Sequence, residues 1–238
     1  YTKALAGDTL QELFFTKYPE KLWGIPTKEL DANWAPKRVQ ITEERRAFYQ
    51  DQWSAVGNEG SGTILGCLEK KVLDLGGVIN LEETIQNIQL SNSNNINKIV
   101  TDKRDINLMP KDIVINTTSC TNFSRFLGFE TNLKYRGVIL VMLELSTAKV
   151  LPEGVDFIYV DDEDIFFNRV SDQNSFIKDP SPDTTIMCCE ITYSPDDKYD
   201  VMNEDELFNN VKTQFASLGL CKLDQITDFK VIKLPEVY

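Results

Sequence analysis

The run RGVILVMLELS at positions 136–146 is almost continuously apolar and rich in aliphatic side chains. A strand with two apolar faces is buried between neighbouring strands, so this run predicts an interior strand of a sheet. The patterns VDFIYV, DIFFNRV, TTIMCCEITY and DFKVIKLP follow it as further strands. Because strands and helices do not alternate regularly, the sequence predicts an α+β fold, with a mixed or antiparallel sheet and helices packed on one face.

Two helices have clear limits in the sequence. Residues 62–75 place apolar side chains on one side of a helix and stop at Gly76-Gly77. Asn203 and Glu206 form the N-x-x-E pattern of a capping box, which predicts a helix that ends at Gly219. The side chains expected to face inward from that helix are Leu207, Val211, Phe215 and Leu218.

The other elements are bounded less sharply. We expect helices over 8–17, around 42–54 and near 120–127, and strands at VINL, TIQNIQL, INKIVTD and DIVINTT (112–118). Pro19 is expected to end the first helix, because proline pushes the residue before it out of the helical region.

Composition excludes several classes of partner. The 238-residue chain has a formal net charge of −12, which argues against nucleic acid or an anionic membrane surface, because both need clustered lysine and arginine. No apolar run approaches the roughly 20 residues that cross a bilayer. The chain has no histidine and five cysteines without a C-x-x-C pattern. This predicts no metal site, and buried reduced thiols in an intracellular, cytoplasmic protein.

Two short clusters have alternative interpretations. Residues Asp161-Asp162-Glu163-Asp164 suggest either a cation site or, as we favour, a solvated hairpin turn between two strands. The glycines at 60, 62 and 66 suggest either a phosphate loop or a flexible entry into the helix at 62–75. The spacing G-x-G-x-x-x-G is not that of a dinucleotide fingerprint, so the second interpretation is preferred.

Two stretches set aromatic rings and arginines outside any core period. Residues 14–38 contain Tyr18, Trp23, Trp34 and Arg38, and the second stretch, 161–176, contains Arg169 beside two phenylalanines. Rings and guanidinium groups in such a setting are candidates for holding a flat, charged ligand. The alternatives are that the tryptophans pack in the core and that Arg169 forms a surface or interface ion pair. In apolar surroundings Arg169 needs an anionic partner, and a phosphate or carboxylate fits its fork.

The first stretch resembles a known pattern. Phe15, Tyr18, Lys21, Trp23 and Gly24, followed by Trp34 and Arg38, resemble the F-x-x-Y-x-x-K-x-W-G…W…R stretch of UDP-galactopyranose mutase-like proteins. That group belongs to the flavin-containing amine oxidase and protoporphyrinogen oxidase superfamily. Three further segments resemble segments of the superfamily and follow one another in the same order as there: LEKKVLDLGGVINLEETIQNI, DIVINTTSCTNFSRFLG and FFNRVSDQNSF. In the second of them, Ser119 replaces the usual proline.

The resemblance also implies what the chain lacks. The N-terminal G-x-G-x-x-G unit that binds FAD and the C-terminal segment that closes over the flavin are absent. We therefore interpret the chain as the central part of a longer flavoprotein that binds FAD weakly or not at all by itself. The division implied is a helical part of a substrate domain at 1–75, partial FAD-domain strands at 76–128, and the substrate-domain sheet and helix at 129–238.

The resemblance assigns roles to individual residues. Tyr18 and Trp23 would flank the base of a nucleotide sugar, and Arg38 and Arg169 would neutralise its pyrophosphate. Ile85 and Thr117 would lie on strands near the FAD adenine. No catalytic side chain is assigned, because in mutases N5 of the reduced flavin attacks the anomeric carbon and the cofactor carries the chemistry.

Three functions remain open from the sequence. The first is the nucleotide-sugar-binding part of a flavin-dependent mutase. The second is the substrate domain of an FAD-dependent amine oxidase, protoporphyrinogen oxidase or desaturase, which would have an apolar pocket or aromatic cage in place of phosphate-binding cations. The third is a binding module without catalysis. The oligomeric state is not predicted.

Overall fold

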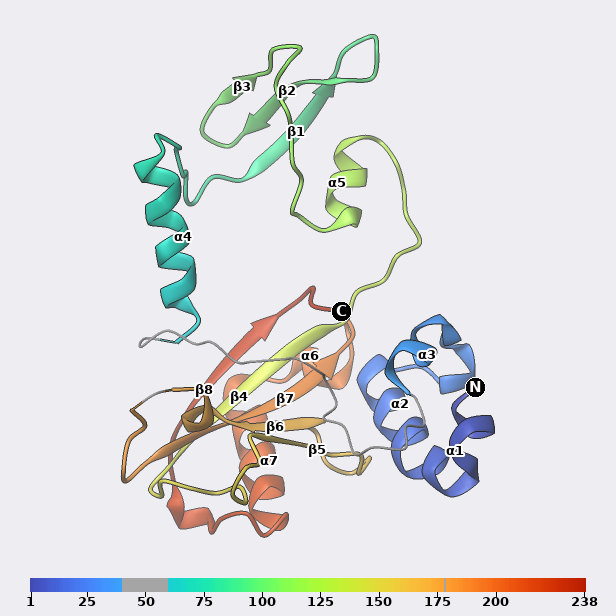
Figure 1. Ribbon diagram of the computed structural model, residues 1–238, viewed down its shortest axis with the longest axis vertical. Helices are drawn as coiled ribbons and strands as arrows, with labels where there is room; N and C mark the ends of the chain where they lie inside the picture. The colour runs from blue at the N-terminus through green and yellow to red at the C-terminus, as the bar shows by residue number, and fades with distance from the viewer. Residues whose placement is uncertain (40–59, 178) are drawn as a thin grey trace. The chain divides into compact units, whose positions relative to one another are not determined.

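The protein is described by a computed structural model of residues 1–39, 60–177 and 179–238. It forms two compact units (Figure 1), one made of residues 1–64 and 135–238 and the other of residues 65–134. The helix predicted around 42–54 lies outside the described residues. The three-part division by role, at 1–75, 76–128 and 129–238, stays a prediction.

The larger unit is built on a five-stranded antiparallel sheet in the order β5-β6-β7-β4-β8. The strands are β4 (Gly137–Leu145), β5 (Phe157–Tyr159), β6 (Arg169–Asp172), β7 (Thr185–Tyr193) and β8 (Ile226–Leu234). Strand β4 pairs with β7 on one side and β8 on the other, so the prediction of an interior strand is confirmed.

One face of this sheet is the core of the unit. Alternate residues of β4, among them Ile139, Val141 and Leu143, have no exposed surface. They belong to the same buried cluster as Leu207 and Phe215 of helix α7 (Glu204–Ser217), which lies against this face (Figure 1). The short helix α6 (Lys198–Val201) precedes α7. The predicted α+β class is confirmed, with an antiparallel sheet and α7 packed on one of its faces.

Helix α7 begins where the sequence predicts. The Asn203 side chain accepts a hydrogen bond from the Glu206 amide at 2.9 Å, and the Asn203 amide donates to the Glu206 carboxylate at 3.0 Å. This reciprocal pair is a capping box, which satisfies backbone donors that the first turn leaves free. The prediction that Leu218 is buried is wrong: Leu218 follows the last helical turn and is 36% exposed.

The N-terminal segment is helical for longer than predicted. It comprises α1 (Thr2–Leu10), a π-helical turn (Gln11–Thr16), α2 (Lys17–Trp23), two 3₁₀ turns (Thr27–Glu29 and Ala32–Trp34) and α3 (Ala35–Arg38). Pro19 does not end the helix. It lies in the first turn of α2, where backbone N–H groups have no partner within a helix, so its missing donor costs little.

The smaller unit holds a three-stranded antiparallel sheet in the order β1-β2-β3. Its elements are β1 (Ile85–Leu90), β2 (Ile96–Thr101), β3 (Asp105–Asn107), α5 (Cys120–Phe126) and α4 (Gly62–Asp74) from Leu65 onward. The strands predicted at VINL and DIVINTT are absent from this described region. Ile113 and Ile115 are 86% and 82% exposed, and a strand forms only where a neighbour pairs with its backbone.

The cysteine prediction is only partly correct. Cys188 and Cys189 of β7 are buried, and burial raises the pKa of the Cys188 thiol to about 12. Cys67 and Cys120 are exposed. Among the described residues, no helix is both long and apolar enough to cross a membrane.

We expect Phe215→Ala to destabilise the larger unit by about 3–5 kcal/mol, because it removes a fully buried ring and leaves a cavity between α7 and the sheet. Phe14, which is 61% exposed and belongs to the same unit, provides the matched control, and Phe14→Ala should change stability by under about 1 kcal/mol. Urea denaturation followed by circular dichroism measures both. Equal losses for the two variants would contradict this description of the core.

Candidate ligand-binding site

The sheet face opposite α7 carries a row of polar and aromatic side chains. Tyr159 of β5 pairs with Arg169 of β6, and Arg169 pairs in turn with Glu190 of β7. Residues directly opposite one another in antiparallel strands point to the same face, so the register brings these three side chains together. Phe157 lies two residues before Tyr159 and faces the same way.

Arg169 has a partner within the chain. Its Nη2 and Nε lie 2.6 Å and 2.8 Å from Oε1 of Glu190, whose side chain is only 11% exposed. The guanidinium carbon also lies 6.0 Å from the centre of the Phe157 ring. Burial by itself lowers the pKa of Arg169. The hydrogen bond to Glu190 and the charge of Glu190 raise that pKa by more than burial lowers it, so the net change is upward. Arg169 is therefore a permanent cation whose charge is largely balanced.

Helix α2 adds two more rings to this cluster. The Tyr18 ring meets the Tyr159 ring edge-on at 4.8 Å between centroids, and Trp23 meets Tyr238 in the same way at 5.9 Å. Burial raises the pKa of both Tyr18 and Tyr238, and Arg169 and Glu190 act electrostatically on each. Their phenols are thus neutral at physiological pH and can donate hydrogen bonds.

These rings are partly open to solvent. Trp23 is 39% exposed, Tyr238 38% and Tyr159 51%. Trp23 is therefore not a core residue. The alternative interpretation of the sequence, in which this tryptophan packs in the core, is wrong. Partly exposed rings around a cation and a carboxylate can stack on a flat group and hydrogen-bond its polar edge. We call Tyr18, Trp23, Phe157, Tyr159, Arg169, Glu190 and Tyr238 the ring cluster.

The structure brings together three of the residues singled out in the sequence: Tyr18, Trp23 and Arg169. Arg38 ends α3, but its side chain is outside the described part of the chain. Ile85 is the first residue of β1 and half-buried, while Thr117 is exposed in an irregular segment. Both belong to the smaller unit.

Sequence reasoning missed Glu190, Tyr159 and Tyr238. Glu190 did carry a signal, because a lone carboxylate inside the apolar run TTIMCCEITY requires a buried cation as partner. Tyr159 and Tyr238 carried none. Tyr238 is held to the start of β4 by two backbone hydrogen bonds with Arg136, of 2.9 Å and 3.1 Å, and this pairing depends on the whole fold.

The glycine that follows Trp23 has a structural role. Gly24 caps α2 in the left-handed region at φ +68°, and an added Cβ would lie 2.1 Å from Nη1 of Arg136. That guanidinium donates to Ser194 at 2.7 Å and to Thr192 at 3.4 Å, and burial lowers its pKa. Its buried Nε has no hydrogen-bond partner in the described structure. Any larger residue at this position would have to displace the Arg136 guanidinium.

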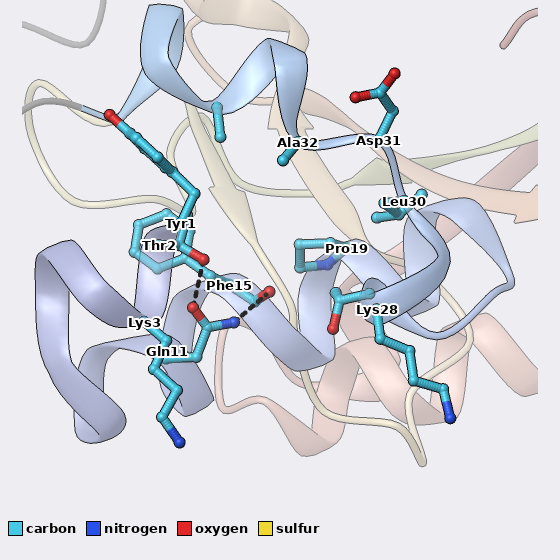
Figure 2. Close-up of a pocket in the computed structure, with 12 residues that line it drawn as sticks. Tyr1, Thr2, Lys3, Gln11, Phe15, Pro19, Lys28, Leu30, Asp31 and Ala32 are labelled. Carbon is cyan, nitrogen blue, oxygen red and sulfur yellow. Dashed lines mark hydrogen bonds between the residues drawn. The ribbon is translucent and has the colours of Figure 1, made fainter.

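Two pockets adjoin α2 in the larger unit. One, of about 450 Å³, is lined by residues that include Lys17, Lys21, Arg136 and Tyr199. The other, of about 270 Å³, lies among the N-terminal helices (Figure 2), where Gln11 donates a hydrogen bond to the carbonyl oxygen of Phe15 at 3.2 Å. Tyr18, Trp23 and Arg169 line neither of these two pockets.

Comparisons with known proteins identify the family. The family model for UDP-galactopyranose mutase matches residues 13–216, most of the chain, and the chain belongs to that family. A structure of reduced UDP-galactopyranose mutase superposes with a TM-score of 0.75 at 13% identity, over 100% of this chain and 54% of that one. A putative protoporphyrinogen oxidase from Exiguobacterium sp. 255-15 superposes with a TM-score of 0.60 at 15% identity, over 75% of this chain and 39% of that one.

No curated protein sequence matches the chain significantly. The two structural likenesses, at 13% and 15% identity, show the fold alone. The chain spans about half the length of the mutase structure that it resembles. The resemblance found in the sequence is thereby confirmed at the level of the family.

We expect Gly24→Ala to destabilise the larger unit more than Gly7→Ala. Both glycines have positive φ, +68° and +80°, so both substitutions introduce backbone strain, but a Cβ at Gly7 meets nothing within 4 Å. The additional cost at Gly24 comes from displacing the Arg136 guanidinium and should be about 1–3 kcal/mol. Thermal unfolding of the two variants measures it, and equal losses would show that the contact with Arg136 is unimportant.

Proposed function

We propose that this chain supplies the nucleotide-sugar-binding region of a flavin-dependent mutase-like protein. The observation that carries the proposal is the convergence of Tyr18 and Trp23 from α2 with Arg169 from β6 on one sheet face. Membership of the UDP-galactopyranose mutase family supports a uridine diphosphate sugar as the substrate class.

Each wall of the proposed site has a different task. Tyr18 and Trp23 would hold the base between rings, and the Tyr18 hydroxyl would hydrogen-bond its polar edge. Arg169 would meet the pyrophosphate through Nη1, the guanidinium nitrogen that Glu190 does not engage. Arg38 is proposed as the second cation from the resemblance alone. The protein would thus bind and orient the substrate, and a bound flavin would supply the redox-active ring.

FAD is proposed as the cofactor of a longer polypeptide that includes this chain. The smaller unit offers Ile85 and Thr117 for the adenine side, and its exposed apolar side chains, such as Ile113 and Ile115, suit a surface that further chain covers. Ile85 and Thr117 would contact only the adenine part of FAD, because no glycine-rich turn of the Rossmann type, which would bind the pyrophosphate, accompanies them in this sequence. The proposed location is the cytoplasm.

The purified 238-residue chain should therefore contain no stoichiometric flavin, and added FAD should bind weakly or not at all. Flavin absorbance after gel filtration, and fluorescence quenching on titration with FAD, measure this. The full-length polypeptide is the control and should retain flavin. A yellow preparation of the 238-residue chain with one flavin per protein would contradict the assignment of a partial FAD domain.

A second candidate is an FAD-dependent oxidoreductase that acts on an amine or apolar substrate. The observation that favours it is the ion pair between Arg169 and Glu190. Because Glu190 balances the charge of Arg169, the surface around the pair consists mainly of aromatic rings. Such a setting suits a cationic or apolar ligand. A binding module without catalysis is the third candidate, and it would bind ligand without turnover in the full-length protein.

Two substitutions separate these candidates in the full-length polypeptide. If a pyrophosphate binds, Arg169→Ala should weaken UDP and UDP-galactose binding by roughly 2–5 kcal/mol. Glu190→Gln should keep or strengthen that binding, because it frees the guanidinium. If a cationic ligand binds, Glu190→Gln should abolish its binding instead. Calorimetric titration measures both, with Arg125→Ala on α5 as the control. Unchanged UDP-galactose affinity in Arg169→Ala would exclude the mutase proposal.

A further inference from the structure

Lys21 on α2 directs its ammonium group at backbone oxygens. Its Nζ donates to the carbonyl oxygens of Val160, Asp162 and Phe167, at 3.2 Å, 2.8 Å and 2.7 Å. An ammonium group has three donors, and here all three are used. No carboxylate in the described structure lies within ion-pair distance of Lys21, although Asp161, Asp162 and Glu163 raise its pKa electrostatically. Burial outweighs them and lowers that pKa to about 8.

The three acceptors lie at the base of the ring cluster. Val160 directly follows Tyr159 at the end of β5, and Phe167 lies two residues before Arg169 at the start of β6. On the other side of the contact, Lys21 is three residues from Tyr18 and two from Trp23 on α2. One ammonium group thus connects the two segments that carry the rings and the guanidinium.

The backbone of Lys21 is fixed as well. Its carbonyl oxygen accepts a hydrogen bond from the Thr192 hydroxyl at 3.1 Å, and Thr192 stands on β7, in the middle of the sheet. The residue is therefore attached to β7 through its carbonyl and to the β5–β6 hairpin through its side chain. Rotation of α2 about its axis or sliding along the hairpin would break one of these contacts.

We infer that Lys21 is a positioning residue, which sets the spacing between Tyr18 and Trp23 on one wall of the site and Tyr159 and Arg169 on the other. The identity of the ligand held between these walls rests on the proposed function. The spacing itself rests on the hydrogen bonds of Lys21.

The contact of Lys21 with three backbone carbonyl oxygens requires a lysine at this position. Methionine has a similar length and fills the same space, but it leaves three carbonyl oxygens without their donor. Arginine keeps the charge, yet its planar fork spreads its donors outward and cannot converge on three carbonyls around one point. Both substitutions should therefore loosen the contact. Lys17, one turn earlier on α2 and exposed, loses the same charge in the control Lys17→Met.

The first test needs no ligand and uses the full-length polypeptide. Hydrogen exchange measured by mass spectrometry should be faster in Lys21→Met and Lys21→Arg than in the wild type, in peptides covering α2 and residues 160–168. Peptides from β4 and α7 should keep their protection, which shows that the variants are folded. Lys17→Met should match the wild type. Wild-type exchange rates in the hairpin and α2 of both Lys21 variants would overturn the inference.

The second test measures UDP affinity by calorimetry in the variants that exchange measurements show to be folded. Lys21→Met should weaken UDP binding about tenfold, and Lys21→Arg should weaken it less. In a Trp23→Ala background the effect of Lys21→Met on UDP affinity should be smaller than in the wild type, because one of the two α2 rings that Lys21 places is already absent. Fully additive losses, or unchanged affinity in Lys21→Met, would overturn the positioning role.

The two tests fail separately. If the wild-type polypeptide does not bind UDP, the proposed function is wrong, and the exchange measurement still decides whether Lys21 fixes the two walls. If UDP binds normally but both Lys21 variants resemble the wild type in exchange and affinity, the proposed function stands and the role of Lys21 is wrong.

Discussion

Side chains of β4 and β7 point alternately to two faces of the sheet, and this alternation decides what each face does. The odd-numbered residues of both strands, such as Val141 and Ile191, are fully buried on the α7 side. The even-numbered residues include Glu190 and Thr192, which hold Arg169 and α2 on the other side. A register shift of one residue would exchange the two sets, so core packing also fixes the site.

The ion pair of Arg169 with Glu190 shapes what such a site can bind. A buried carboxylate and a half-buried guanidinium stabilise each other, so the charge of each is compensated within the protein. Under the proposed function, a phosphate would either share the guanidinium through Nη1 or draw it away from Glu190. In the first case the pair orients the guanidinium in advance, and the cost of ordering its long side chain has already been met in the free protein.

How much the sequence predicts depends on how local the cause is. The capping box of Asn203 and Glu206 involves four consecutive residues, so the start of α7 follows from the pattern alone. Pro19 misleads because the π-helical turn before it shifts the start of α2, and no local rule foresees that turn. DIVINTT has the residues of a strand, but a strand also requires a neighbour. The resemblance selected Tyr18, Trp23 and Arg169, whereas Glu190 joins them through strand pairing and Tyr238 through its backbone hydrogen bonds with Arg136.

The Thr192 hydroxyl shows why the site could not be assembled from sequence patterns. It donates to the carbonyl oxygen of Lys21 and accepts from Arg136 at 3.4 Å and from Asn168 at 3.2 Å, so its donor and both its acceptor positions are used. Its partners come from α2, the residue before β4 and the residue before β6. A saturated hydroxyl among three segments has few alternative arrangements, and it favours a single placement of α2 on the sheet. The position of the α2 rings therefore depends in part on a threonine that no motif marks.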